Sequence, residues 1–314
     1  MSDSKKLILK GFLYTSVGLF FSKVFTYGWR IVAARVGVEE YGMLSIVLAV
    51  MSFLIPISAL GLGSAVERYV SYYIGKDDRV GVRSTIVNSL KVSAFTSIFV
   101  SILLFLSSDF IATKIFNDSE LGVLLKLFSV FLPLLVLDQV ISPLFRVYNR
   151  LDYFTFVKYM LESSLKFGLA LLLIYFGYGI FGVAFAYLAS IGLSAILLFY
   201  FSRKHCFNFF KNEGVINNNI SELLKYSVPL VFSIIAGFVL TSTDTLMIAF
   251  FKGSAQAGIY NVAYPTANLL LLIPAAMLAV FLPIITKDFA RKNFEDIKNT
   301  YQFITKWIFV FNFF

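Results

Sequence analysis

Long apolar runs recur along the whole chain and decide its fold class more than any other feature. Eight runs and the start of a ninth lie near residues 11–34, 41–64, 84–106, 121–142, 153–176, 180–202, 226–250, 255–285 and from 297 onward. The hydrocarbon core of a bilayer is about 30 Å thick and needs ~20 such residues in a helix. The runs lack the in/out alternation of membrane barrel strands. The sequence therefore predicts an all-α, polytopic membrane protein.

The composition supports this class and excludes several others. Hydrophobic residues make up 59% of the chain and charged residues only 14%, against roughly 25% charged in a soluble domain. One cysteine, Cys206, and one histidine, His205, are too few for a disulfide framework or a metal site of soft ligands. No nucleotide-binding loop, zinc-protease motif or Ser/His/Asp set is present. We expect neither an enzyme nor a bound cofactor or metal.

The basic residues predict the orientation of the chain in the membrane. With a cytoplasmic N-terminus, 18 of the 27 Lys and Arg residues lie in cytoplasmic segments, and only Arg35, Lys114 and Lys252 lie in outer loops. This distribution follows the positive-inside rule. It predicts a multi-pass protein of the cytoplasmic membrane with its N-terminus inside the cell. It also explains most of the net charge of +9 without a nucleic-acid partner.

An internal repeat is indicated at an offset of 215 residues. It aligns four basic pairs: Lys10 with Lys225, Lys76 with Arg291, Arg83 with Lys298, and Lys91 with Lys306. At nearly the same offset, the EEYG ending at Gly42 matches the AQAG ending at Gly258. Any two cytoplasmic loops tend to be basic, which would explain the first three pairs. It would not explain the pair of Lys91 with Lys306, because both residues lie within spans. We interpret the pattern as two pseudo-repeated lobes.

The repeat also predicts the domain organisation. Residues 1–202 would form a first six-helix lobe, 203–221 a cytoplasmic connection, and 222–314 the first part of a second lobe. Spans seven to nine then correspond to spans one to three. A complete second lobe needs about three more helices, so we expect a fragment, or a split gene product whose partner polypeptide supplies the missing helices.

Ionisable residues within the spans are the candidate site residues, since burying them in a membrane is costly. The cations are Lys23, Arg30, Lys91, Lys126, Lys166 and Lys306, and the anions are Asp138, Glu162 and Asp244. The cations outnumber the anions, and internal pairing alone does not account for the excess. An anionic ligand in a cavity would account for it.

Depth separates the cations of the first span. Lys23 lies roughly 20 Å along the helix from Lys10, which favours a cavity residue. Arg30 lies near the outer boundary, where it either lines the cavity or reaches the outer head groups. We expect Lys126, near the outer end of the fourth span, to reach the head groups.

The remaining candidates leave alternatives open. Glu162 precedes Lys166 by one turn, in the order that favours a helical ion pair, so a structural pair and a functional site are both consistent. Lys91 and Asp138 lie at comparable depth and are candidate partners. Asp244, near the outer end of the seventh span, is either an interface residue or a coupling-cation site.

Several segments carry a resemblance to a known family. They are ARVGVEEYGMLSIVLAV, GLGSAVERYVSYYIGK, and the later stretch with x-P-L at Pro229, Asp244, Gly-x-Tyr at Gly258 and a proline at Pro283. The chain resembles polysaccharide biosynthesis (Wzx-type) flippases of the MATE-like superfamily over roughly the first two thirds of their length. The resemblance implies two six-helix lobes around a central cavity with alternating access.

The resemblance also implies a function. Such flippases move lipid-linked oligosaccharides, carried on a polyprenyl phosphate or pyrophosphate, from the cytoplasmic to the outer leaflet. Cationic residues of the first helix are important in the family, which singles out Lys23 and Arg30; Lys91 and Lys166 would also stabilise a phosphate. Asp138, Glu162 and Asp244 are candidates for the cavity or for a coupling ion. The alternatives are a cation-coupled multidrug exporter and, less well matched, a membrane-embedded glycan polymerase or ligase.

Overall fold

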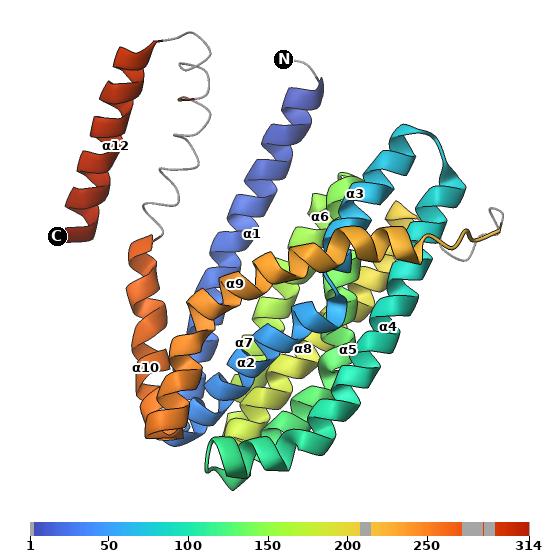
Figure 1. The fold of residues 1–314 in the computed structure, drawn as a ribbon. Coiled ribbons are helices and arrows are strands. Elements are labelled where there is room, and N and C mark those ends of the chain that lie inside the picture. Colours follow the sequence, from blue (N-terminus) through green and yellow to red (C-terminus); the bar gives the residue numbers. More distant parts are fainter. Residues whose placement is uncertain (1–2, 208–214, 272–284, 286–292, 314) are drawn as a thin grey trace. The chain divides into compact units, whose positions relative to one another are not determined.

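The computed structural model describes residues 3–207, 215–271, 285 and 293–313, and these residues are mostly helical (Figure 1). Five helical segments among them are long and apolar enough to cross a membrane: Val38–Ala59, Arg79–Ile115, Ser119–Val147, Gly179–Cys206 and Ile220–Lys252. No strand occurs in this part of the chain. The protein is therefore all-α and polytopic, as the apolar runs predict.

The chain divides into two compact units, Met1–Ile259 and Tyr260–Phe314. The first contains α1 (Asp3–Ala34), α2 (Val38–Ala59), α3 (Leu62–Gly75), α4 (Arg79–Phe110), α5 (Ser119–Val147), α6 (Leu151–Phe154), α7 (Glu162–Tyr175), α8 (Gly179–Phe201) and α9 (Ile220–Lys252). Three short π-helical segments, η1 (Ile111–Ile115), η2 (Thr155–Leu161) and η3 (Ser202–Cys206), belong to the same unit. Helix α10 (Ser254–Ala267) begins in it, and η4 (Asn268–Leu271) and α12 (Phe294–Phe313) belong to the second unit.

The predicted spans correspond to these helices with local differences. The first predicted span is the later part of α1, which carries Lys23 and Arg30. The fifth is divided into α6, η2 and α7. The eighth begins as α10, and the described residues continue to Leu271 before a gap. Pro283 of the family resemblance and Arg291 of the repeat lie outside the described residues. The predicted lobe boundaries at 202 and 222 stay a prediction.

The second predicted span, 41–64, ends earlier than the sequence indicated. Leu60 and Gly61 both adopt left-handed backbone conformations, with φ of 49° and 65°. A left-handed residue ends the i to i−4 hydrogen-bond ladder, so α2 stops at Ala59 and α3 starts at Leu62 as a separate helix. Because this stretch is uniformly apolar, its hydrophobic pattern does not reveal where the helix ends.

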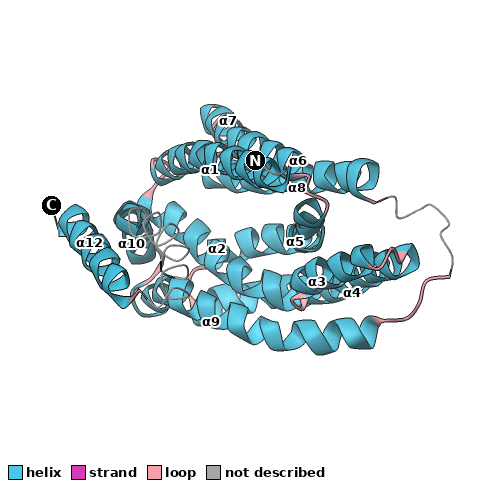
Figure 2. Cartoon of the chain, turned by 90° about the horizontal axis from the view of Figure 1, so that it is seen from above, coloured by secondary structure: helices cyan, strands magenta, loops and turns pink. Residues whose placement is uncertain are grey.

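Helix α5 is the centre of the first unit. It packs against α4, α2, α8 and α3, and Figure 2 shows it between the group of α1, α7 and α8 and the group of α3, α4 and α9. Its side chains Phe128, Leu132 and Leu144 are fully buried. Helix α1 packs on η2 and α7, where the Ser22 and Ser163 hydroxyls lie 2.8 Å apart.

Helices α2 and α10 approach each other closely at one end of this unit. A Cβ added at Gly42 would overlap with the Ser254 carbonyl, and one added at Gly258 would overlap with the Val38 carbonyl. The two backbones can meet only because both positions lack a side chain. These are the two glycines that the sequence repeat aligns, so the predicted equivalent positions lie against each other in space.

The segment before α9 is tied to α4. The Asn88 amide donates to the Asn217 carbonyl at 2.8 Å and to Asn219 Oδ1 at 2.7 Å. The Asn217 N–H donates to the Ser84 hydroxyl at 2.9 Å. These bonds fix where the chain enters α9, which packs on α2 and α3.

Candidate functional site

A cavity of about 380 Å³ is lined by residues of α1, α2, α5, α7, α8 and α9. Its lining residues are Thr26, Trp29, Arg30, Leu48, Met51, Ser52, Ile55, Pro56, Gln139, Lys166, Tyr187 and Phe238. They come from helices far apart in the sequence, so only the tertiary packing brings them together. The lining combines two cations with aromatic rings and neutral polar groups.

The two cations of the cavity are Arg30 and Lys166. Lys166 is only 7% exposed, and its ammonium lies 5.4 Å from the ring centre of Trp29 and 5.5 Å from that of Tyr187. Such contacts between an ammonium and aromatic rings are attractive and strengthen when water is excluded. None of the described lining residues carries a carboxylate. The wall is therefore positively charged, and its chemistry suits an anion.

A buried charge network lies beside the cavity. The Lys158 ammonium lies 2.8 Å from Asp138 Oδ2 and 2.8 Å from Glu162 Oε2. Glu162 Oε2 also accepts a hydrogen bond from the Ser194 hydroxyl at 2.6 Å, and Asp138 Oδ1 accepts one from Ser142 at 3.2 Å. Both carboxylates are 7% exposed. Hydrogen bonds and a shared cation thus satisfy two buried anions, which a low-dielectric interior requires.

This network corrects two expected pairings. The structure pairs Asp138 with Lys158 rather than with Lys91, which is exposed on α4. It also pairs Glu162 with Lys158, one turn earlier, rather than with Lys166 one turn later. Both pairs involve Lys158, which the sequence analysis does not name among the ionisable residues of the spans.

Lys158 is the functional candidate that the sequence analysis did not find. It lies in η2, near the start of the predicted fifth span at 153–176. Its spacing of four residues before Glu162 was the available signal. That signal was weak, because the Lys-to-Glu order is the less favourable one in an isolated helix.

The other predicted candidates lie apart from the cavity lining. Lys23 is exposed on α1, two turns before Arg30. Asp244 is half-buried on α9, and its Oδ1 accepts the N–H of Thr245 at 2.9 Å. Lys126 forms an exposed ion pair with Asp109 at 2.6 Å. The structure thus brings together Arg30 and Lys166, with Asp138 and Glu162 next to them.

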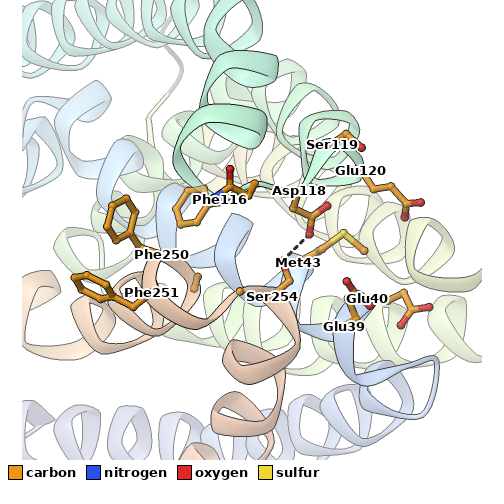
Figure 3. A pocket seen from close by; sticks show the side chains of 13 residues that line it. Glu39, Glu40, Met43, Phe116, Asp118, Ser119, Glu120, Phe250, Phe251 and Ser254 are labelled. Atoms are coloured by element: carbon orange, nitrogen blue, oxygen red, sulfur yellow. Dashed lines mark hydrogen bonds between the residues drawn. The ribbon is translucent and has the colours of Figure 1, made fainter.

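A second pocket, of about 610 Å³, has the opposite charge. It lies where α2, the start of α5 and the turn between α9 and α10 meet, and Glu39, Glu40 and Glu120 line it (Figure 3). Asp118 also lines it and accepts a hydrogen bond from the Ser254 hydroxyl at 2.5 Å. Within the described residues, no group of three or more His, Cys, Asp and Glu side chains is arranged to hold a metal ion. The basic cavity is the candidate site, because it brings Arg30 and Lys166 together from different helices.

Solved structures with the same fold are membrane transporters. The chain superposes with a TM-score of 0.77 on an inward-facing multidrug resistance MATE family transporter of the MOP superfamily, with 17% identity over 96% of this chain and 71% of that one. A MATE structure in a straight conformation gives 0.71, with 18% identity over 99% and 71% of the two chains. A MOP superfamily transporter from Pyrococcus furiosus, described as having a binding pocket of reverse polarity that suggests a different function, gives 0.70, with 18% identity over 99% and 70%. No curated protein matches the chain.

Sequence comparison gives the family directly. The polysaccharide biosynthesis protein family matches residues 8–289, which is most of the chain. The chain belongs to the polysaccharide biosynthesis protein family and is a multi-pass membrane protein with the fold of the MATE and MOP transporters.

Proposed function

We propose that this protein moves a lipid-linked oligosaccharide or polysaccharide repeat unit from the cytoplasmic to the outer leaflet of the cell membrane by alternating access. The carrier would be a polyprenyl phosphate or pyrophosphate. The observation that carries the proposal is the cavity in which Arg30 and Lys166 lie without a carboxylate among the described lining residues. Family membership supports a glycan as the cargo.

The chemistry of the cavity fits this cargo in two parts. A phosphate oxygen would accept charge-assisted hydrogen bonds from the Arg30 guanidinium and the Lys166 ammonium, which are stronger where water is scarce. Thr26, Ser52 and Gln139 also line the cavity, and their polar groups would supply hydrogen bonds to sugar hydroxyls. The prenyl tail would stay in lipid.

Other charged residues have proposed roles outside the cavity. Lys23 lies about 10 Å from Arg30 along α1, and Lys91 is exposed on α4. We place both on the path by which the phosphate reaches or leaves the site. Asp138, Glu162 and Asp244 remain the proposed cavity or coupling-ion residues, and the first two are the anions that pair with Lys158.

Ligand binding tests the site directly. The chain has two tryptophans, Trp29 and Trp307, so in a Trp307→Phe background the fluorescence of Trp29 reports on the cavity. Farnesyl pyrophosphate should change this fluorescence. Lys166→Met and Arg30→Met should each weaken binding about tenfold or more, because each removes a charged hydrogen-bond donor. Lys126→Met, which affects only an exposed ion pair, is the matched control and should bind normally.

Transport tests the whole proposal. In liposomes, the protein should move a polyprenyl-pyrophosphate-linked oligosaccharide to the opposite leaflet, where an added glycosidase can cut it. Lys23→Ala should lower this rate without lowering membrane insertion. A wild-type protein that binds no pyrophosphate and moves no glycan would overturn the proposal.

A multidrug exporter is the second candidate, because MATE transporters share the fold. A site for cationic drugs is expected to offer carboxylates or open aromatic faces. Here a lysine already occupies the faces of Trp29 and Tyr187. Tetraphenylphosphonium in the Trp29 assay separates the two: binding of this cation in place of pyrophosphate would favour the exporter.

A glycan polymerase or ligase fits less well. Gly37 and Gly253 lie at one end of the first unit. The described connections at that end are each three residues or shorter: Arg35–Gly37, Phe116–Asp118, Phe176–Tyr178 and Gly253. A membrane-embedded enzyme of this class would need larger loops there to hold catalytic Arg or His residues. Short turns leave no room for such a site on these helices.

A further inference from the structure

Glu162 lies between two lysines, and the structure shows which of them it pairs with. Lys158 precedes it by four residues and Lys166 follows it by four, so both are about one helical turn away. The Lys158 ammonium lies 2.8 Å from Glu162 Oε2. Among the described residues, no ion pair joins Glu162 to Lys166. Glu162 therefore pairs with Lys158, and Lys166 lines the cavity.

Two further contacts hold Glu162 in this arrangement. The Ser194 hydroxyl of α8 donates to the same Oε2 at 2.6 Å. Lys158 is itself anchored by Asp138 of α5, whose Oδ2 lies 2.8 Å from the ammonium. The network therefore spans α5, η2, α7 and α8. A rotation of Glu162 toward Lys166 would break contacts to two other elements.

The charge balance explains what this arrangement does for the cavity. Asp138, Glu162 and Lys166 are each 7% exposed, and Lys158 is partly buried. They supply two carboxylates and two ammoniums. Without Lys158, the buried cation left on α7 for these carboxylates to pair with would be Lys166. An ammonium paired with a carboxylate is a poor partner for a second anion, because the ligand would have to displace or repel that carboxylate.

We propose that Lys158 is a positioning residue: by holding Asp138 and Glu162, it keeps the Lys166 ammonium free to bind the anionic group of the cargo. This inference rests on the proposed function, since it assigns Lys158 a role in ligand binding through another residue. Lys158 itself is not among the residues lining the cavity. Its effect on binding is therefore indirect and passes through Glu162.

Charge-neutral variants test this role in the Trp29 assay with farnesyl pyrophosphate, all in the Trp307→Phe background. Lys158→Met should weaken binding at least tenfold, because Glu162 then turns to Lys166. Adding Glu162→Gln to Lys158→Met should restore binding to within about threefold of the wild type, because the competing anion is gone. Lys158→Arg, which keeps the cation, should bind like the wild type.

The rescue separates positioning from a structural role. A merely structural Lys158 predicts that the double variant, which has lost both partners, binds no better than Lys158→Met. Normal binding by Lys158→Met, or no rescue by Glu162→Gln, would overturn the inference. If Lys158→Met does not fold, loss of binding by the conservative Lys158→Arg with its fold intact gives the same negative answer.

The outcome for the inference is distinguishable from that for the function. Binding that requires Lys166 but not Lys158 would overturn the positioning role and leave the proposed function intact. A wild-type protein that binds no pyrophosphate would overturn both.

Discussion

Lys158 and Lys166 are stabilised in two different ways in this protein. Lys158 lies between two carboxylates, whereas Lys166 lies over two aromatic rings. An ion pair neutralises the charge, whereas ring faces leave most of it available to a ligand. We therefore propose that the neighbours of each ammonium, and not residue type or depth, separate a structural lysine from a binding one.

The burial of the Lys158 network should be visible in stability. Asp138→Ala leaves a buried ammonium with one partner fewer and should lower the free energy of unfolding by about 3–5 kcal/mol. Asp109→Ala is the matched control, because its carboxylate also pairs with a lysine, Lys126, but is 68% exposed; the expected loss is about 1 kcal/mol or less. Denaturation in mixed detergent and SDS measures both, and equal losses would contradict the assignment.

Helix interruptions shape the site at the scale of elements. The predicted fifth span contains the π-helical segment η2, which carries Lys158. π-Helical turns insert an extra residue into the ladder and are frequent at functional sites. The break at Leu60 and Gly61 similarly separates α2, which lines the cavity, from α3, which does not. Local departures from a straight helix thus decide which side chains reach the cavity.

The contact between α2 and α10 is the element-scale feature most open to test. Gly42→Leu should separate the two helices, because a side chain at Gly42 meets the Ser254 backbone, and overpacking of this kind costs about 1–3 kcal/mol. The melting temperature of the purified protein should fall by several degrees. Gly168→Leu on α7, where an added Cβ meets nothing within 4 Å, is the control. Equal melting temperatures for both variants would show that the close approach does not matter.

At the scale of the whole molecule, the distribution of basic residues predicts the orientation in the membrane. The described turn at Lys76–Asp78 and the turn at Phe116–Asp118 lie at opposite ends of α4 with its extension η1. The sequence predicts that the first turn is cytoplasmic and the second is outside, because basic residues collect in cytoplasmic loops.

Single cysteines test this orientation in intact cells. After Cys206→Ser removes the one native cysteine, a membrane-impermeant maleimide should label Lys114→Cys but not Lys76→Cys. Permeabilising the membrane should make both reactive. The reverse pattern would invert the topology and, with it, the proposed direction of transport.

The sequence alone determined the class of fold and the chemistry of the candidate residues. Apolar runs of about 20 residues nearly suffice to predict membrane helices. Lipid offers the backbone N–H and C=O groups no hydrogen-bond partners, so they must bond to each other. The excess of cations over anions within spans likewise follows from composition. Arg30 and Lys166 were both named from the sequence, and the cavity holds both.

Partner choice was decided only by the tertiary structure. The sequence offered Glu162 two lysines at equal spacing, and the packing of α5, η2 and α8 around it selected Lys158. Lys91 and Asp138 share a depth, but depth does not fix the face of a helix that meets its neighbour. Spacing along a chain gives helix positions, whereas pairing between helices depends on their rotation and contact, which no local pattern encodes.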